Sequence, residues 1–273
     1  MILYKYVSFG SAVKIIKNSS LGFTCLEDLN DPFEGTNFGF SDSGSITLRC
    51  ATRAFKNNFS RRYALLSLTR NPLNSLMWSH YGDSHKGVVI GIDIELAGLT
   101  SEDEFIIPAN MGEMTYVATK NSNLNGVPSS QHLDEIKSNE LKFCNEIKNY
   151  LKQAFLYKSL EWAYEEEVRI IKSLSNFNFL YHGDYSENLD DSWSKLRLNA
   201  FGQPLFCYSI PKNAIKEIYL GTNFYRNVSR VNEGKDKDKV LKELDFIKSQ
   251  SCNVYVCEPD FSSWKMSARL ITS

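Results

Sequence analysis

The sequence predicts an α+β fold, built as a single domain over residues 1–273 with mixed or antiparallel sheets and about four flanking helices. The chain of 273 residues is 42% hydrophobic and 23% charged, which is enough apolar sequence to bury a core. About ten short apolar segments bounded by turn residues are typical of strands. About four longer segments repeat their apolar residues with the period of an amphipathic helix.

The individual elements follow from local patterns. Residues 2–8 alternate in hydrophobicity and predict a strand, and Ser8 is a good N-cap for a helix over residues 10–17. Residues 26–35, after a short strand at 21–25, are rich in turn residues and carboxylates. Further strands are predicted at 63–69, 88–93, 112–117, 162–173, 204–210, 215–221, 253–257 and 266–271, further helices at 45–59, 133–157 and 236–249, and a polar hairpin or loop at 183–203.

The connection between the strands at 63–69 and 88–93 carries side chains that a core does not need. It begins with turn chemistry at Pro72, and residues 76–81 predict one or two helical turns. Binding and catalytic groups are often held on such a loop by a rigid scaffold. The candidate residues in it are Trp78, Ser79, His80, Tyr81, Asp83, His85 and Lys86.

A second stretch, residues 158–172, carries paired carboxylates. If residues 164–171 are extended, Glu165, Glu167 and Arg169 share one face, while Val168 and Ile170 face the core and Glu166 lies at the mouth. A solvated surface strand is one explanation of these charges, and an aromatic-covered site is the other. Two carboxylates on one face can stabilise an oxocarbenium-like transition state and activate a nucleophile, as in glycoside cleavage. Cleavage of the nicotinamide–ribose bond of NAD has the same character.

Other constellations are weaker. His80 and His85 lack the i, i+4 spacing and a nearby third ligand, so no metal site is predicted, and His80 is either a pocket hydrogen-bonding residue or a structural histidine. No GxSxG elbow supports a Ser-His-Asp triad. The cluster of Asp28, Asp31 and Glu34 is best explained as a turn with Asx hydrogen bonds, the alternatives being a cation site or a helix cap.

The charge and cysteine content of the chain indicate which partners and which cellular compartment to expect. The net charge of −1 argues against a strong overall phosphate-binding field. The six cysteines form no CxxC pair and are interpreted as buried free thiols of a reducing compartment. Neither a signal peptide nor an apolar run long enough to span a bilayer is recognised. We therefore expect a cytoplasmic protein without a membrane partner.

Several of these segments together resemble the bacterial family catalogued as domain of unknown function 2971. The resemblance extends over roughly residues 2–221, which leaves 222–273 as a C-terminal helix and strands packed on that core. The segments are Leu3-Tyr-Lys-Tyr6, Leu29-Asn-Asp-Pro-Phe-Glu34, Ser67-Leu-Thr69, Met77-Trp-Ser-His-Tyr-Gly82, His85-Lys-Gly-Val-Val-Ile-Gly91 and Trp162-Ala-Tyr-Glu-Glu-Glu-Val-Arg169, with Ile215-Lys-Glu-Ile-Tyr-Leu-Gly221 as a weaker piece.

More distantly, the chain resembles the ADP-ribosyltransferase fold, which implies a split sheet and NAD as substrate. Ser67-Leu-Thr69 is similar to the middle site of those enzymes and Glu165-Glu-Glu167 to the late-strand carboxylate site, whereas the first site has Tyr4, Lys5 and Tyr6 where those enzymes have Arg or His. The resemblance implies Glu167 as the catalytic carboxylate on the nicotinamide ribose, with Glu165 helping the acceptor. It further implies that Ser67 and Thr69 support the site, that Tyr6, Trp78 or Tyr81 stacks on nicotinamide, and that Lys86 or Arg169 meets the pyrophosphate.

Three functions remain open from the sequence. The first is an NAD-using ADP-ribosyltransferase-like enzyme, in line with relatives that act as bacterial toxins or phage-defence effectors, with Glu167, Glu165 and His80 as catalytic candidates. Its nucleotide-binding candidates are Tyr4, Tyr6, Ser67, Thr69, Trp78, Tyr81, Lys86 and Arg169. The sequence does not name its acceptor, which is a protein, a nucleic acid or a small molecule. The second is a nuclease or hydrolase that uses His80, His85 and carboxylates. The third is a non-catalytic module that binds a nucleotide or a protein.

Overall fold

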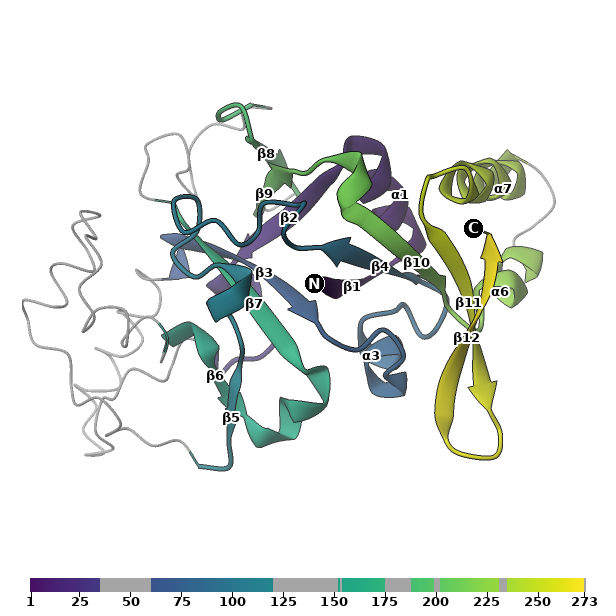
Figure 1. The fold of residues 1–273 in the computed structure, drawn as a ribbon, viewed down its shortest axis with the longest axis horizontal. Coiled ribbons are helices and arrows are strands. Elements are labelled where there is room, and N and C mark those ends of the chain that lie inside the picture. The colour runs from purple at the N-terminus through teal and green to yellow at the C-terminus, as the bar shows by residue number, and fades with distance from the viewer. Residues whose placement is uncertain are drawn as a thin grey trace, which may run out of the picture.

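The computed structural model describes residues 1–34, 60–119, 152, 154–174, 188–198, 202–230 and 235–272. Within them, four α-helices flank one large sheet and one small sheet, which confirms the predicted α+β class (Figure 1). The helices are α1 (Phe9–Asn18), α3 (Ser75–His80), α6 (Phe224–Arg230) and α7 (Lys235–Lys248). The strands are β1 (Ile2–Val7), β2 (Ser20–Cys25), β3 (Tyr63–Thr69), β4 (Val88–Asp93), β5 (Thr115–Val117), β6 (Tyr157–Ser159), β7 (Glu167–Ser173), β8 (Trp193–Arg197), β9 (Pro204–Ser209), β10 (Ile215–Leu220), β11 (Asn253–Asp260) and β12 (Lys265–Thr272).

The large sheet has ten strands in the order β12-β11-β10-β4-β1-β3-β2-β9-β8, with β7 added on β3. Strand β3 connects the strands on its two sides, because it pairs with β1, β2 and β7. It pairs with β7 along its whole length, from Tyr63↔Ser173 to Thr69↔Glu167, but it meets β1 only at Tyr4↔Thr69. Because β1 continues along β4 instead, the sheet is split between β1 and β3. This split positions the candidate site.

Local sequence explains the first helix and its place on the sheet. The Ser8 hydroxyl accepts from the backbone N–H of Ser11 and caps the start of α1, and Ser19 ends the helix in the left-handed conformation. One face of α1 is buried in the main core, where Leu244 and Ile247 of α7 are also buried. The predicted N-cap and helix are therefore confirmed.

The C-terminal segment extends the same sheet. Strand β11 pairs in parallel with β10, and β12 pairs antiparallel with β11 at the sheet edge. Only the first half of β11 lies against β10, so the far half of the β11–β12 hairpin projects beyond the sheet (Figure 1). Its tip exposes Phe261 and Trp264 almost completely.

Some predicted elements differ from the structure. Residues 160–165 form a 3₁₀ helix, so the strand predicted at 162–173 begins only at Glu167. Tyr157, predicted as the last residue of the helix at 133–157, begins β6 instead. Only residues 115–117 of the strand predicted at 112–117 form a strand. Helix α6 was not predicted, and the polar segment 183–203 contains β8, which forms a hairpin with β9. The helix predicted at 45–59 and most of the one at 133–157 lie outside the described residues. No helix in the described ranges combines the length and the apolarity needed to cross a membrane.

Candidate functional site

A pocket of about 180 Å³ lies where β1 and β3 separate. Its lining comes from β1, β2, β3 and β7, from the turn after β2, from α3 and the residue after it, and from β6 and the segment that leads to β7. It is lined by Tyr4, Lys5, Tyr6, Gly22, Thr24, Leu29, Asn30, Glu34, Leu65, Ser67, Leu68, Thr69, Met77, Tyr81, Lys158, Glu165, Glu167 and Arg169.

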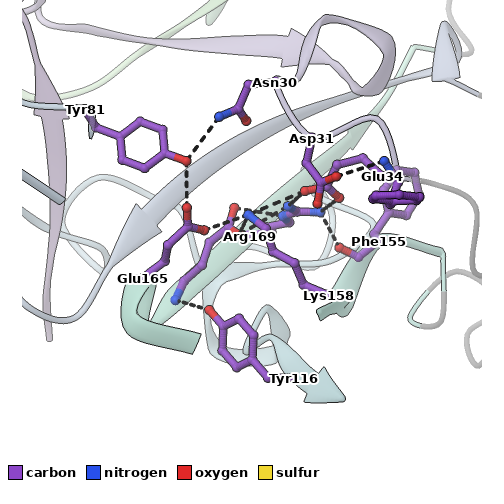
Figure 2. A network of polar contacts seen from close by, with 11 residues as sticks. Asn30, Asp31, Glu34, Tyr81, Tyr116, Phe155, Lys158, Glu165 and Arg169 are labelled. Carbon is purple, nitrogen blue, oxygen red and sulfur yellow. Dashed lines mark hydrogen bonds and ion pairs between the residues drawn. The ribbon is translucent and has the colours of Figure 1, made fainter. Parts of the chain in front are cut away.

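A buried ionic network lies on one side of this pocket (Figure 2). Arg169 is 1% exposed, and its guanidinium donates to both carboxylate oxygens of Glu34, at 2.6 and 2.8 Å. It also donates to both oxygens of Glu167, at 2.8 and 3.2 Å, and to the carbonyl of Phe155 at 2.8 Å. A guanidinium has five N–H donors, so Arg169 has none left for a ligand. The structure therefore offers no support for the predicted contact of Arg169 with a pyrophosphate, which stays a prediction.

Lys158 joins the two candidate carboxylates. Its ammonium donates to Glu165 at 2.6 Å and to Glu167 at 3.2 Å, and it lies 3.5 Å from Glu34. The other oxygen of Glu165 accepts a 2.6 Å hydrogen bond from the Tyr81 hydroxyl, which in turn accepts from the Asn30 amide at 3.3 Å (Figure 2). The carboxylate-bearing segment and the Trp-Ser-His-Tyr connection thus meet at one pocket.

The two carboxylates reach the pocket from different elements. Glu165 ends the 3₁₀ helix, and Glu166 follows in the left-handed conformation with φ of 45°. This reversal starts β7 at Glu167, which pairs with Thr69, while Arg169 pairs with Ser67 on the same face. The predicted strand face is correct for Glu167 and Arg169. It is wrong for Glu165, because the chain is not extended there.

The environments of the two carboxylates push their pKa values apart. Burial acts to raise the pKa of Glu167, but Arg169 and Lys158 outweigh it and lower this pKa to about 2. Burial raises the pKa of Glu165, and Glu167 adds to the rise while Lys158 opposes it. Such a separation is a mark of carboxylate pairs that divide acid and base roles.

Strand β1 lines the pocket with a lysine between two tyrosines. The Tyr6 hydroxyl donates to the carbonyl of Asn71 at 2.8 Å, and the Tyr4 hydroxyl donates to Glu217 at 3.0 Å. The Lys5 ammonium donates to the carbonyl of Ser67 at 3.0 Å, across the split between β1 and β3. Burial lowers the pKa of Lys5 to about 8, although the negative charge of Glu167 opposes this shift.

The structure brings most predicted site residues together. Eight of them line the pocket: Tyr4, Tyr6, Ser67, Thr69, Tyr81, Glu165, Glu167 and Arg169. Ser67 donates a side-chain hydrogen bond that helps to lower the pKa of Glu167. The Thr69 hydroxyl instead accepts from the backbone of Asn71 and holds the turn after β3.

Three predicted residues lie outside the pocket. Trp78 is fully buried, donates to the carbonyl of Pro72 at 2.9 Å and packs edge-on against Tyr6, so it is a core residue. His80 is exposed on α3, and Lys86 lies in the turn before β4. Neither of them lines the pocket, to which Met77 of α3 and its C-cap residue Tyr81 contribute instead.

Sequence reasoning missed Lys158 and Glu34 as site residues. Glu34 was interpreted mainly as part of a turn, yet Asn30 and Glu34 of this turn line the pocket, and Glu34 is the second carboxylate that binds Arg169. The Asx interpretation holds for Asp31, which accepts from the backbone of Phe33. A signal was present, because an arginine on a buried strand needs carboxylate partners, and these can come from elsewhere in the chain. Within the described residues, no cluster of His, Cys, Asp and Glu is arranged to hold a metal ion.

Residues 77–170 match the family model described as "Protein of unknown function (DUF2971)". This region begins in α3 and ends within β7, so it contains Tyr81, Lys158, Glu165, Glu167 and Arg169. Comparisons with curated proteins and with solved structures find no match. The wider family resemblance over residues 2–221 and the likeness to the ADP-ribosyltransferase fold stay predictions.

Proposed function

We propose that the pocket binds the nicotinamide end of NAD and that the protein is an ADP-ribosyltransferase-like enzyme that cleaves the nicotinamide–ribose bond. The observation that supports this most is the pair of buried carboxylates, Glu165 and Glu167, held by one ammonium in a tyrosine-lined pocket with their pKa values pushed apart. Cleavage of an N-glycosidic bond needs a fixed negative charge beside the developing oxocarbenium ion and a second group that handles the nucleophile's proton.

The two roles follow from the two environments. Glu167, with its lowered pKa, is ionised over the physiological range and supplies the fixed negative charge. Glu165, with its raised pKa, accepts the proton of the attacking hydroxyl or water, while Tyr81 orients its carboxylate through their 2.6 Å hydrogen bond. Tyr4 and Tyr81 offer aromatic surface for the nicotinamide ring.

The size of the pocket limits how much of the nucleotide enters. Its volume of about 180 Å³ is below the roughly 300–1,000 Å³ of pockets that enclose a drug-sized ligand. We therefore expect nicotinamide and its ribose to enter, with the adenosine part outside.

Glu165→Gln is the sharpest test. The change is nearly isosteric, and Lys158 keeps its contacts with Glu167 and Glu34, so we expect the fold to persist. The wild-type protein should bind NAD and release nicotinamide, and the variant should bind NAD but release nicotinamide at least about 100-fold more slowly. Calorimetry and chromatographic detection of nicotinamide would measure the two steps, with exposed Lys14→Gln as the control. A wild-type protein that neither binds nor consumes NAD would contradict the proposal.

A toxin or defence role would follow from the same chemistry in cells. Expression of the wild-type chain in bacteria should lower cellular NAD and slow growth, and expression of Glu165→Gln should do neither. Equal growth inhibition by both proteins would show that the toxicity does not depend on NAD cleavage, which would contradict this role.

A non-catalytic nucleotide-binding module is the second candidate. It is favoured by the internal neutralisation of Glu167 by Arg169 and Lys158. It predicts NAD binding without nicotinamide release and equal affinity for wild type and Glu165→Gln. A nuclease or hydrolase built on His80 and His85 has no such support, since neither histidine lines the pocket.

A further inference from the structure

Lys5 differs from the other cations of the pocket. Lys158 contacts three carboxylates and Arg169 contacts two, but Lys5 has no carboxylate within 4 Å among the residues that the structure describes. Its single hydrogen bond, to the carbonyl of Ser67, uses one of the three N–H donors of an ammonium group. Lys5 is half-buried in the pocket lining, so its ammonium loses part of its hydration without a carboxylate in contact to compensate, and release of its proton removes that cost.

We propose that Lys5 is a nucleophilic amine that captures small aldehydes or ketones entering the pocket as imines. This goes beyond cleavage of NAD and does not depend on it. The geometry supports it in two ways: Lys5 lines the pocket, and its attachment to Ser67 fixes the amine at the split of the sheet. The low pKa of about 8 agrees with this role, because desolvation in a pocket is the usual way in which a lysine becomes nucleophilic at neutral pH.

The remaining pocket groups suit the steps of imine formation. The Lys5 lone pair attacks the carbonyl carbon, a C–N bond forms as the C=O π bond breaks, and a proton passes from the nitrogen to the carbonyl oxygen to give a carbinolamine. Loss of the hydroxyl as water then needs an acid, and the raised pKa of Glu165 makes it a suitable donor. The product is a protonated imine, whose positive charge replaces that of the ammonium in the field of Glu167. No oxidation or reduction is involved.

The pocket also indicates which carbonyl compounds fit. A volume of about 180 Å³ admits a single substituted ring or a short sugar, and tyrosines on two sides favour a flat molecule. Pyridine-3-carbaldehyde has that size and shape and is a suitable probe.

The experiment treats the intact protein with pyridine-3-carbaldehyde and sodium cyanoborohydride at pH 7.5, then locates the secondary amines by peptide mass spectrometry. Lys5 should be labelled at least about tenfold faster than the exposed Lys14, and its labelling should level off above about pH 8 while that of Lys14 keeps rising. The preference should vanish in urea. Lys5→Arg, which keeps a charged donor for Ser67, should abolish the rapid labelling, and Lys14→Arg should not.

Lys5 labelled no faster than Lys14 in the native protein would overturn the inference, and this readout needs no variant. The result is also independent of the NAD proposal. Nicotinamide release without preferential labelling of Lys5 would contradict only the proposed imine formation at Lys5. Rapid labelling of Lys5 without nicotinamide release would contradict only the NAD proposal.

Discussion

Glu167 is the residue on which most of the buried charge of the pocket converges. Both of its oxygens accept from Arg169, and one also accepts from Lys158. Its side chain is about 6% exposed, so water screens these contacts little. The charge of Glu167 therefore contributes to folding as well as to the site.

The stability of the protein should consequently depend on the ionisation of Glu167. Its pKa is about 2 in the folded protein against 4.5 for an ordinary glutamate, so its contribution is fully present above about pH 5 and is lost as the pH falls through 4.5 toward 2. We expect Glu167→Gln to lower the free energy of unfolding by about 3 kcal/mol at pH 6, and by much less at pH 2.5.

Urea unfolding of both proteins between pH 2.5 and 6 would measure this difference. The raised pKa of Glu165 acts in the opposite direction, so the comparison between the two proteins is the informative quantity. Glu113→Gln is a matched control, because Glu113 pairs with Arg70 at 2.7 Å but is exposed, and its removal should cost at most about 0.5 kcal/mol. Parallel pH profiles for wild type and Glu167→Gln would contradict the prediction.

At the scale of elements, β7 depends on a close approach by Gly112. The carbonyl of Gly112 accepts from the backbone of Arg169 at 2.8 Å, and a Cβ on Gly112 would overlap the Arg169 carbonyl oxygen. Gly112→Ala should therefore push residues 112–114 away from β7 and lower the free energy of unfolding by about 3 kcal/mol.

Gly10→Ala is the matched control for Gly112→Ala. Gly10 lies in α1, and a Cβ there would meet nothing within 4 Å. Alanine should therefore raise the free energy of unfolding by about 0.5–1 kcal/mol, because it restricts the unfolded chain and favours the helix. Thermal and urea unfolding would measure both variants, and a tolerated Gly112→Ala would show that the contact with β7 is dispensable.

The same scale shows what a sequence can and cannot reveal. Strands β3 and β4 were predictable because they are continuous apolar runs, and α1 because Ser8 precedes a regular apolar stripe. The shared face of Glu167 and Arg169 followed from strand alternation. Glu165 was misplaced because a single left-handed residue, Glu166, separates a 3₁₀ helix from a strand, and no periodic pattern marks such a reversal. The partnership of Arg169 with Glu34 spans 135 positions and depends on tertiary packing alone.

The whole molecule has a core shared between its ends. Residues after 221 contribute Phe224, Val228, Leu244, Ile247 and Val254 to the core that contains α1 and β4. Each such side chain contributes about 1.5–3 kcal/mol by its burial, and together they match the roughly 5–15 kcal/mol by which a typical protein is stable.

A chain ending at residue 221 should therefore fail to fold. We expect the full chain to unfold in one cooperative transition and the 1–221 fragment to be insoluble or to lack a transition, as followed by circular dichroism and calorimetry. Removal of the exposed tip residues instead, by Phe261→Ser with Trp264→Ser, should change the free energy of unfolding by less than about 0.5 kcal/mol. A soluble fragment with its own cooperative transition would show two independent units.

The separation of β1 from β3 divides the pocket into two parts. One part is fixed by the pairing of β3 with β7, and the other, on β1, can change in sequence more freely. Glu167 and Arg169 stand on β7, which pairs with β3 along its whole length, whereas β1 pairs with β3 at a single register position. Replacements on β1 can therefore reshape the opening without disturbing the ladder beneath the carboxylates. Descendants of one ancestral chain could in this way acquire different ligands while inheriting the same reactive floor.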